Sequence, residues 1–326
     1  MTDGLTRAAE VLGAASEVAI ACHVNPDADA LGSMLALSNF LRGRGVETVC
    51  SFGNKPFELP RWAALLPGGE ALVEPGSFPK SPEVMVTCDA ASLDRLGMLA
   101  ASVARARDVI WLDHHLGDGD LGTISVVDST ASSSCEIAFR LIKRMGGELS
   151  AETATCLYAG LVTDTGRFQY EAVRPETLEL AAELRRYPFD HTRLVQALYE
   201  DSGLSYLRLV GVALQRLEHE PDADLVWTYL TQADLAGAGI SPSEADDLID
   251  VIRTAREADV AAVVKQQRDG RFKVSVRSRG NHDVQAVASS FGGGGHRLAA
   301  GYTSKHGLAG TVERLTAALR GKPPHP

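Results

Sequence analysis

An imidazole and two carboxylates lie within seven residues of one another near the start of the chain, at His23, Asp27 and Asp29. They directly follow the apolar run 18–22, and a helical pattern of apolar side chains begins at Leu31. This order predicts a buried strand, a loop that carries the polar side chains, and then a helix. Carboxylates this close repel one another and are costly to bury without a compensating cation. The segment is therefore a candidate metal site, with a solvated acidic turn as the alternative.

Size and charge limit the classes of protein that the chain can represent. Its 326 residues favour two domains over one. Hydrophobic residues make up 45% of the chain and charged residues 23%, which is typical of a folded globular protein. The formal net charge of −10 argues against a basic surface that binds long nucleic acid. A short phosphate-bearing ligand remains compatible with this charge, because bound divalent cations would reverse its sign locally.

The sequence shows no signal for export or for a membrane. Its five cysteines are an odd number without a C-x-x-C pair, which fits a reducing cytoplasm. The N-terminus is acidic and leads into an amphipathic helical pattern rather than a signal peptide. No segment approaches the ~18 uninterrupted apolar residues of a membrane span. We therefore expect a cytoplasmic protein with no membrane partner.

Short apolar runs alternate with helical stretches through the first half of the chain. We expect strands at 17–22, 46–51, 83–88, 108–112 and 123–127, and helices at 4–14, 30–43, 131–146 and 151–163. Such alternation is typical of βαβ units. It predicts an α/β fold whose N-terminal domain is built on a mostly parallel, doubly wound sheet.

The pattern changes in the second half and predicts a smaller α+β domain. We expect helices at 204–218, 283–290 and 308–320, and strands at 225–230, 260–267 and 272–278. The last two strands flank Asp269-Gly270, which is a strong hairpin signal. We place the first domain at 1–187, a linker at 188–205 and the second domain at 206–326, with a cleft between the domains.

Acidic and imidazole side chains follow three further apolar runs. These side chains are Asp89, the run Asp113-His114-His115, and Asp164. Each acid taken singly is more often a turn or helix-cap residue. Sites in open α/β sheets gather at the carboxyl ends of strands, so we expect these segments to converge. Their imidazole and carboxylate groups suit Mn²⁺ or Mg²⁺, with Fe²⁺, Co²⁺ or Zn²⁺ as alternatives, and suffice for two ions. Metal-activated hydrolysis of a phosphoester is the chemistry that such a pair supports.

Taken in order, these motifs resemble those of the DHH phosphoesterases, a family named after the run at Asp113-His114-His115. Four segments match the family motifs: HVNPDADALGS, VTCD, LDHH and LVTDTGRF. A later segment, FGGGGHRLAAG, resembles the GGGH motif of the companion DHHA1 domain. Together the matches span residues 23–301. The resemblance implies a metal-binding catalytic DHH domain followed by a DHHA1 domain that binds substrate.

The resemblance also implies a role for each matched residue. One ion would be held by His23, Asp27 and Asp89. The second would be held by Asp29, Asp89, His114 and Asp164, so that Asp89 bridges two ions, most simply Mn²⁺, with Mg²⁺, Co²⁺ or Fe²⁺ as alternatives. His115 would be the imidazole that faces the substrate, and Asp89 and His115 are the expected catalytic residues. Asp113 would orient His114 or its loop.

The glycine run at 292–295 is a candidate substrate loop. Four glycines allow backbone amides to cradle an anion, although a flexible loop is the alternative when the run is taken alone. It is not a P-loop, because no Gly-Lys-Ser/Thr follows. The resemblance implies that Gly293, Gly294, Gly295 and His296 bind substrate. Arg277 is the expected phosphate contact and Arg279 the competing choice; either could instead be a surface charge.

Within the family, the chain is similar to the nanoRNase/pAp phosphatase group, whose relatives also cleave cyclic dinucleotides. This similarity implies hydrolysis of cyclic di-AMP, linear dinucleotides or nanoRNA to 5′-mononucleotides, with 3′-phosphoadenosine 5′-phosphate as a further substrate. One alternative is a sensor that binds a nucleotide second messenger and has a vestigial metal site. A more distant alternative is an enzyme like the family II pyrophosphatases. The relatives also point to a homodimer.

Overall fold

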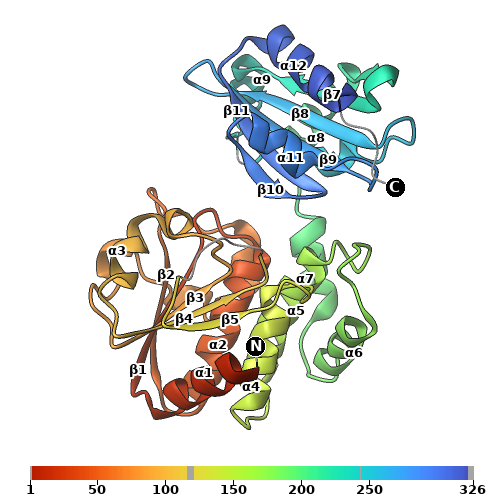
Figure 1. Cartoon of the computed structure of the whole chain (residues 1–326). Coiled ribbons are helices and arrows are strands. Elements are labelled where there is room, and N and C mark those ends of the chain that lie inside the picture. The colour runs from red at the N-terminus through yellow and green to blue at the C-terminus, as the bar shows by residue number, and fades with distance from the viewer. Residues whose placement is uncertain (1, 116–120, 243, 322–326) are drawn as a thin grey trace. The chain divides into compact units, whose positions relative to one another are not determined.

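The structure, a computed structural model, describes residues 2–115, 121–242 and 244–321. The chain forms two compact units, of which the first ends at Asp201 and the second begins at Ser202 (Figure 1). Each unit is built on its own β-sheet. None of the described helices is long and apolar enough to cross a membrane.

The first unit contains a five-stranded sheet in the order β2-β1-β3-β4-β5. Its strands are β1 (Glu17–Cys22), β2 (Glu47–Phe52), β3 (Val84–Cys88), β4 (Asp108–Asp113) and β5 (Ile124–Val127). All neighbouring strands pair in parallel, with Cys22 opposite Cys88 and Cys88 opposite Leu112. The carboxyl ends of the central strands therefore meet at one edge. This confirms the predicted parallel sheet.

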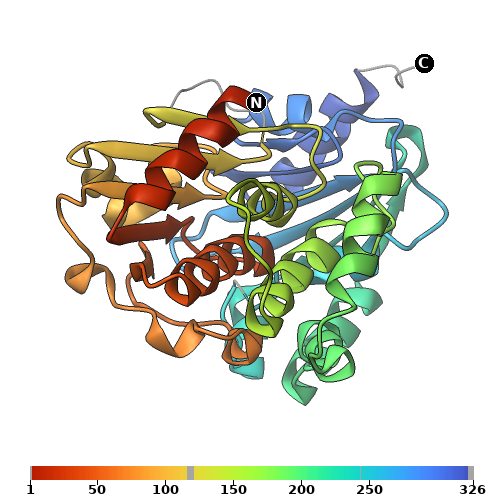
Figure 2. The ribbon, with the colours of Figure 1, turned by 90° about the horizontal axis from the view of Figure 1, so that it is seen from below.

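Helices and short turns cover both faces of this sheet. The helices are α1 (Thr2–Ala14), α2 (Ala28–Gly43), α3 (Ala100–Val103), α4 (Ser134–Arg144), α5 (Ala151–Asp164), α6 (Pro175–Leu184) and α7 (His191–Tyr199). Side chains of α1, α2, α4 and α5 pack with Val18 and Ile20 on one face, and α1 crosses the strands in Figure 2. On the other face, Ala19 and Ala21 pack against the 3₁₀ turn Leu93–Leu99 and its neighbours. The sheet is thus doubly wound.

The strand order creates a topological switch point between β1 and β3. The chain runs from β1 to β2 on one side, and then returns to place β3 on the other side of β1. Such a point opens a crevice at the carboxyl ends of the two strands, where ligands of α/β proteins commonly bind. His23 follows β1 directly, and Asp89 follows β3 directly.

The second unit contains a mixed six-stranded sheet in the order β10-β11-β9-β8-β7-β6. Its strands are β6 (Glu218–Glu220), β7 (Leu225–Leu230), β8 (Val260–Gln266), β9 (Phe272–Ser278), β10 (Gly294–His296) and β11 (Ala299–Ser304). Among the described strands of this unit, β7 and β8 pair in parallel and the other neighbours pair antiparallel. One face packs against α8 (Leu204–Gln215), α9 (Gln232–Ala238) and α10 (Leu248–Ile252), and the other against α11 (Val284–Ser290) and α12 (Leu308–Arg320). This matches the predicted smaller α+β domain.

Local details of the structure add to or correct the expectations: the expected helix 204–218 ends at Gln215, and Glu218–Glu220 form strand β6. The glycine run, for which a flexible loop was the alternative, enters strand β10 and pairs with β11. The boundary between the units lies within segment 188–205, the expected linker, and this segment also contains helix α7 and the start of α8. Helix α4 begins at Ser134 rather than at 131, because the Ser133 hydroxyl accepts a hydrogen bond from the Glu136 amide and caps the helix. The domain limits 1–187 and 206–326 stay a prediction.

Candidate metal centre

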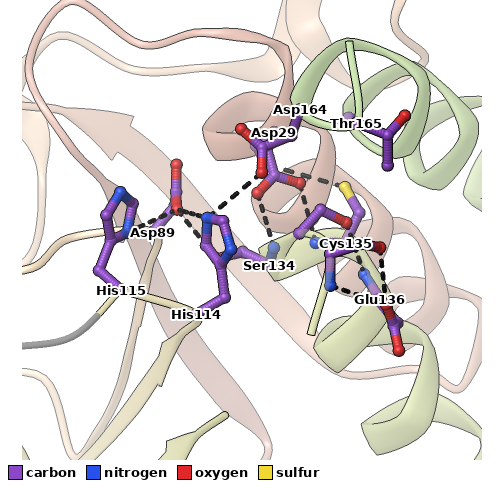
Figure 3. A network of polar contacts seen from close by, with 12 residues as sticks. Asp29, Asp89, His114, His115, Ser134, Cys135, Glu136, Asp164 and Thr165 are labelled. Atoms are coloured by element: carbon purple, nitrogen blue, oxygen red, sulfur yellow. Dashed lines mark hydrogen bonds and ion pairs between the residues drawn. The ribbon is translucent and has the colours of Figure 1, made fainter. Parts of the chain in front are cut away.

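The six side chains expected to bind metal lie together at the carboxyl edge of the five-stranded sheet. They form overlapping groups in which one ligand atom per residue lies within 4.8 Å of the others. The groups are His23 with Asp27 and Asp89, Asp29 with His114 and Asp164, and Asp89 with His114 and His115. Asp89 and His114 each belong to two groups, so the groups are continuous. Figure 3 shows Asp29, Asp89, His114, His115 and Asp164 of these groups.

The first group joins the end of β1 to the end of β3. His23 Nε2 lies 3.3 Å from Asp89 Oδ2 and 3.7 Å from Asp27 Oδ2. His23 Nδ1 donates a hydrogen bond to the carbonyl of Val24 at 2.8 Å, which leaves Nε2 available as a ligand. Asp27 caps helix α2 with its other oxygen, which accepts the amides of Asp29 and Ala30. The cap therefore leaves Asp27 Oδ2 beside His23.

The second group joins α2, the loop after β4 and the end of α5. His114 Nε2 lies 3.4 Å from Asp164 Oδ2 and 3.7 Å from Asp89 Oδ1. Asp29 is buried in the first turn of α2. Asp89 thus has an imidazole near each of its oxygens, His23 at one and His114 at the other.

His115 is held by Asp113, whose side chain is fully buried. Asp113 Oδ1 accepts hydrogen bonds from the His115 backbone amide at 2.9 Å and from ring Nδ1 at 2.6 Å. The Trp111 indole donates to the other oxygen at 3.3 Å. We expected Asp113 to orient His114 or its loop; the contact lies in that loop and is made to His115. The His115 side chain keeps 25% of its surface exposed, as a group facing a substrate must.

The pKa values report an excess of negative charge at this edge. Burial and the neighbouring carboxylate of Asp89 raise the pKa of Asp29 to about 7. Burial, together with Asp29 and Asp89, also raises the pKa of Asp164 well above its usual value. Burial alone would lower the pKa of His23, but hydrogen bonds to Asp27 and Asp89 raise it to about 10. The pKa values of these acids are raised because they are buried and because their negative charges would repel one another. Bound cations would compensate those charges, so the donor set fits divalent metal ions.

The structure adds residues to this site that the sequence reasoning missed. The backbone amides of Ser134 and Cys135 donate to the two oxygens of Asp29, and the Ser134 hydroxyl donates to Asp89. The run Ser132-Ser133-Ser134 before a helical pattern was an available signal for a helix N-terminus.

Gly160 is a second missed residue, on the face of α5 that packs against α2. A Cβ atom at this position would lie 2.7 Å from Asp29 Oδ1 and 2.8 Å from Asp29 Cα, and it would overlap Cys135 Sγ. Only glycine therefore allows the two helices to approach closely behind Asp29. An isolated glycine within a helical pattern was the available signal.

Apart from His115, the residues expected to bind substrate lie in the second unit. Gly294, Gly295 and His296 form β10, and Gly293 precedes it. The register places His296 opposite Ala299 and Ala299 opposite Arg277, so His296 and Arg277 share one face of the sheet. Arg279 lies beyond the end of β9, where it is exposed and donates to the Ala255 carbonyl. This arrangement favours Arg277 over Arg279 as the partner of His296.

A further group of potential ligands lies in the second unit and consists of Asp224, Asp259 and His282. Both oxygens of Asp259 already accept hydrogen bonds, from the Ser278 hydroxyl at 2.6 Å and the Asn281 amide at 3.2 Å. His282 pairs with Asp224 at 3.3 Å. These contacts join the loops at one edge of the sheet and explain the group as a structural network.

Two family models match the chain: the DHH family, N-terminal domain, over residues 17–161, and the DHHA1 domain over residues 225–321. The bifunctional oligoribonuclease and PAP phosphatase NrnA of Thermus thermophilus is 34% identical over 96% of this chain and 92% of its own length. The protein of the same name from Bacillus subtilis is 29% identical over 86% of each chain. A crystal structure of an exopolyphosphatase-related protein from Bacteroides fragilis superposes with a TM-score of 0.91 at 25% identity, covering 98% of this chain and 96% of that one.

Proposed function

The chain belongs to the DHH family of phosphoesterases and carries a DHHA1 domain, and on this premise we propose that it hydrolyses short nucleotides with two divalent cations. That it is a hydrolase acting on nucleotide phosphoesters follows from the family and its relatives. The identity of the ions, the assignment of ligands and the choice of substrate are the content of the proposal.

Asp89 is the observation on which the two-ion proposal depends. Its Oδ2 lies 3.3 Å from His23 Nε2, and its Oδ1 lies 3.7 Å from His114 Nε2. Each of these imidazoles has a further acid beside it, Asp27 for His23 and Asp164 for His114. A carboxylate between two such pairs is placed as a bridging ligand would be. We assign one ion to His23, Asp27 and Asp89, and the second to Asp29, Asp89, His114 and Asp164.

Mn²⁺ is the proposed metal, because imidazole and carboxylate ligands together suit it, with Mg²⁺, Co²⁺ or Fe²⁺ as alternatives. Two such ions, held by these residues, would supply Lewis acidity and would lower the pKa of a water molecule. His115 acts beside them as a hydrogen-bond donor to a phosphoryl oxygen or to the leaving group. Burial would lower the pKa of His115, but the hydrogen bond to Asp113 and the charges of Asp89 and Asp113 raise it. Because Asp113 holds the ring of His115 in one orientation, the ring does not have to reorient when the transition state forms.

The proposed substrates are short because the chain is acidic and its relatives are named for short ones. The Thermus thermophilus and Bacillus subtilis relatives are named oligoribonuclease and PAP phosphatase, which supports nanoRNA, linear dinucleotides and 3′-phosphoadenosine 5′-phosphate. Cyclic di-AMP is the further candidate. We propose that Arg277, His296 and the amides of Gly293, Gly294 and Gly295 hold the part of the substrate that lies away from the scissile phosphate. We also propose that the protein acts in the cytoplasm as a homodimer.

Release of 5′-AMP is the direct test. The purified chain is freed of metal, supplied with Mn²⁺, and incubated separately with a diribonucleotide, with cyclic di-AMP, with 3′-phosphoadenosine 5′-phosphate and with pyrophosphate. We expect Mn²⁺-dependent release of 5′-AMP from at least one nucleotide, with no release in chelator and none from the Asp89→Ala variant. Tight binding of a cyclic dinucleotide, with no turnover in the presence of any of the proposed metals, would favour the alternative that the protein is a nucleotide sensor. Hydrolysis of pyrophosphate but of none of the nucleotides would favour the alternative that the protein is a pyrophosphatase.

A further inference from the structure

Helix α4 begins at the metal centre, and its first two residues contact two of the proposed ligands. The Ser134 amide lies 2.6 Å from Asp29 Oδ2, and the Cys135 amide lies 2.9 Å from Asp29 Oδ1. The Ser134 hydroxyl donates to Asp89 Oδ1 at 2.9 Å (Figure 3). All of these side chains are buried. One residue therefore contacts both a carboxylate assigned to the second ion and the carboxylate assigned to both ions.

Asp89 is a residue whose orientation needs support. Its backbone has a φ of +56°, in the left-handed region that is uncommon for residues with a side chain, although Asp enters it more readily than most. The Asp89 amide donates to the Leu112 carbonyl at 3.0 Å, which ties the backbone to the neighbouring strand. The side chain is held separately, by His23 at Oδ2 and by the Ser134 hydroxyl at Oδ1. The rings of His115 and His114 also lie near Oδ1, at 3.4 and 3.7 Å.

The turn that carries Ser134 is itself held in place by a charge network around the buried carboxylate of Glu136. Glu136 is 3% exposed, and its Oε2 accepts the amide and the hydroxyl of Ser132 at 2.9 and 2.7 Å. Its Oε1 pairs with Arg174 at 2.9 Å and also with Arg140. Arg140 in turn pairs with Asp128 at 2.6 Å. Moving the serine turn would break hydrogen bonds to a buried carboxylate, which is costly, so the Ser134 hydroxyl has a fixed position.

We propose that Ser134 is a positioning residue of the metal centre. Its hydroxyl holds the Asp89 carboxylate in one orientation, and its amide holds Asp29. This inference rests on the proposed function, since Asp89 bridges two ions only if two ions bind. Because Ser134 acts through the metal ligands rather than on the substrate, its loss should weaken metal binding and leave KM for the nucleotide unchanged.

Comparison of Ser134→Ala with Ser133→Ala tests this role. Ser133 is the adjacent residue and is equally buried, but its hydroxyl caps helix α4 by accepting the Glu136 amide at 3.1 Å. Mn²⁺ affinity of the metal-free proteins is measured by calorimetric titration, and folding by thermal melts in chelator. We expect Ser134→Ala to weaken Mn²⁺ binding by ~10–100-fold, the usual cost of losing a group that orients a ligand. We expect Ser133→Ala to lower the melting temperature with a much smaller change in Mn²⁺ affinity.

Kinetics and a conservative variant complete the test. For Ser134→Ala, kcat should fall at limiting Mn²⁺ and recover at saturating Mn²⁺. The Ser134→Thr variant retains the hydroxyl and should therefore bind Mn²⁺ more tightly than Ser134→Ala. Wild-type Mn²⁺ affinity in a folded Ser134→Ala protein would overturn the inference, and so would an equal loss of affinity in Ser133→Ala. If the wild-type chain itself binds no Mn²⁺, the proposed function fails, and this outcome is recognised without any variant.

Discussion

Replacement of Gly160 by alanine should displace Asp29, one of the proposed metal ligands. Helices α2 and α5 pack closely at this position. The added Cβ atom would lie 2.7 Å from Asp29 Oδ1 and 2.8 Å from Asp29 Cα, and it would overlap Cys135 Sγ. A backbone Cα cannot be moved by changing a rotamer, so α2 and α5 must separate. Asp29 would then lose its place between Ser134, Cys135 and the other proposed ligands.

The expected change in the free energy of unfolding is the sum of two opposing contributions. Overpacking of a buried site costs ~1–3 kcal/mol. Alanine in place of glycine inside a helix returns ~1 kcal/mol. Because backbone atoms must move, we expect the cost to be near its upper bound, with a net loss of ~1–2 kcal/mol and a melting temperature ~2–8 °C lower for a unit of this size. Displacement of a proposed ligand should also weaken Mn²⁺ binding by at least ~10-fold.

Thermal melts in chelator and calorimetric Mn²⁺ titrations measure the two effects separately. The matched control is Gly13→Ala in helix α1 of the same unit, where an added Cβ would meet nothing within 4 Å. We expect this control to keep Mn²⁺ affinity and to melt at the wild-type temperature or slightly above it. A Gly160→Ala protein that melts higher than wild type and binds Mn²⁺ as tightly would refute the reasoning.

Three further predictions concern the division of labour within the site. Asp89→Ala should abolish both Mn²⁺ binding and turnover. His115→Ala should keep its metal content, measured by elemental analysis, while its kcat falls ~10²–10³-fold. Loss of metal in His115→Ala would contradict the assignment of His115 to the substrate rather than to an ion. The raised pKa of Asp29, about 7 in the metal-free protein, means that protons compete with the ion, so Mn²⁺ affinity should rise with pH through this range, with proton release seen calorimetrically in buffers of different ionisation enthalpy. His23 and Asp164, whose pKa values are also raised, should contribute to the same dependence, and an Mn²⁺ affinity that does not change with pH would contradict this expectation. His296→Ala should weaken turnover of a dinucleotide much more than that of bis(p-nitrophenyl) phosphate, and equal losses on both would show that the second unit does not bind the nucleotide.

The sequence by itself determined the strands of the first sheet, three strands of the second sheet, and which segments of the first unit deliver acidic groups. It did not predict strands β6, β10 and β11. Apolar periodicity is a local property, and it located all five strands of the first sheet within about two residues. The residues after those strands are equally local, so His23, Asp89 and His114 could be recognised as candidates before any fold was known. The order of the family motifs added their proposed division between two ions.

Only the tertiary structure decided how these segments meet. The order that puts β1 between β2 and β3 depends on packing across the whole sheet, and it is this order that brings His23 within 3.3 Å of Asp89. The Ser134 hydroxyl reaches Asp89 from 45 residues away. Strand β10 forms in a glycine run only because β11 supplies its hydrogen bonds. Side-chain pattern records which residues prefer burial, whereas contacts between distant segments depend on the direction of each helix and the order of the strands. The ligand candidates were therefore visible in the sequence, and the groups that hold them in place were visible only in the fold.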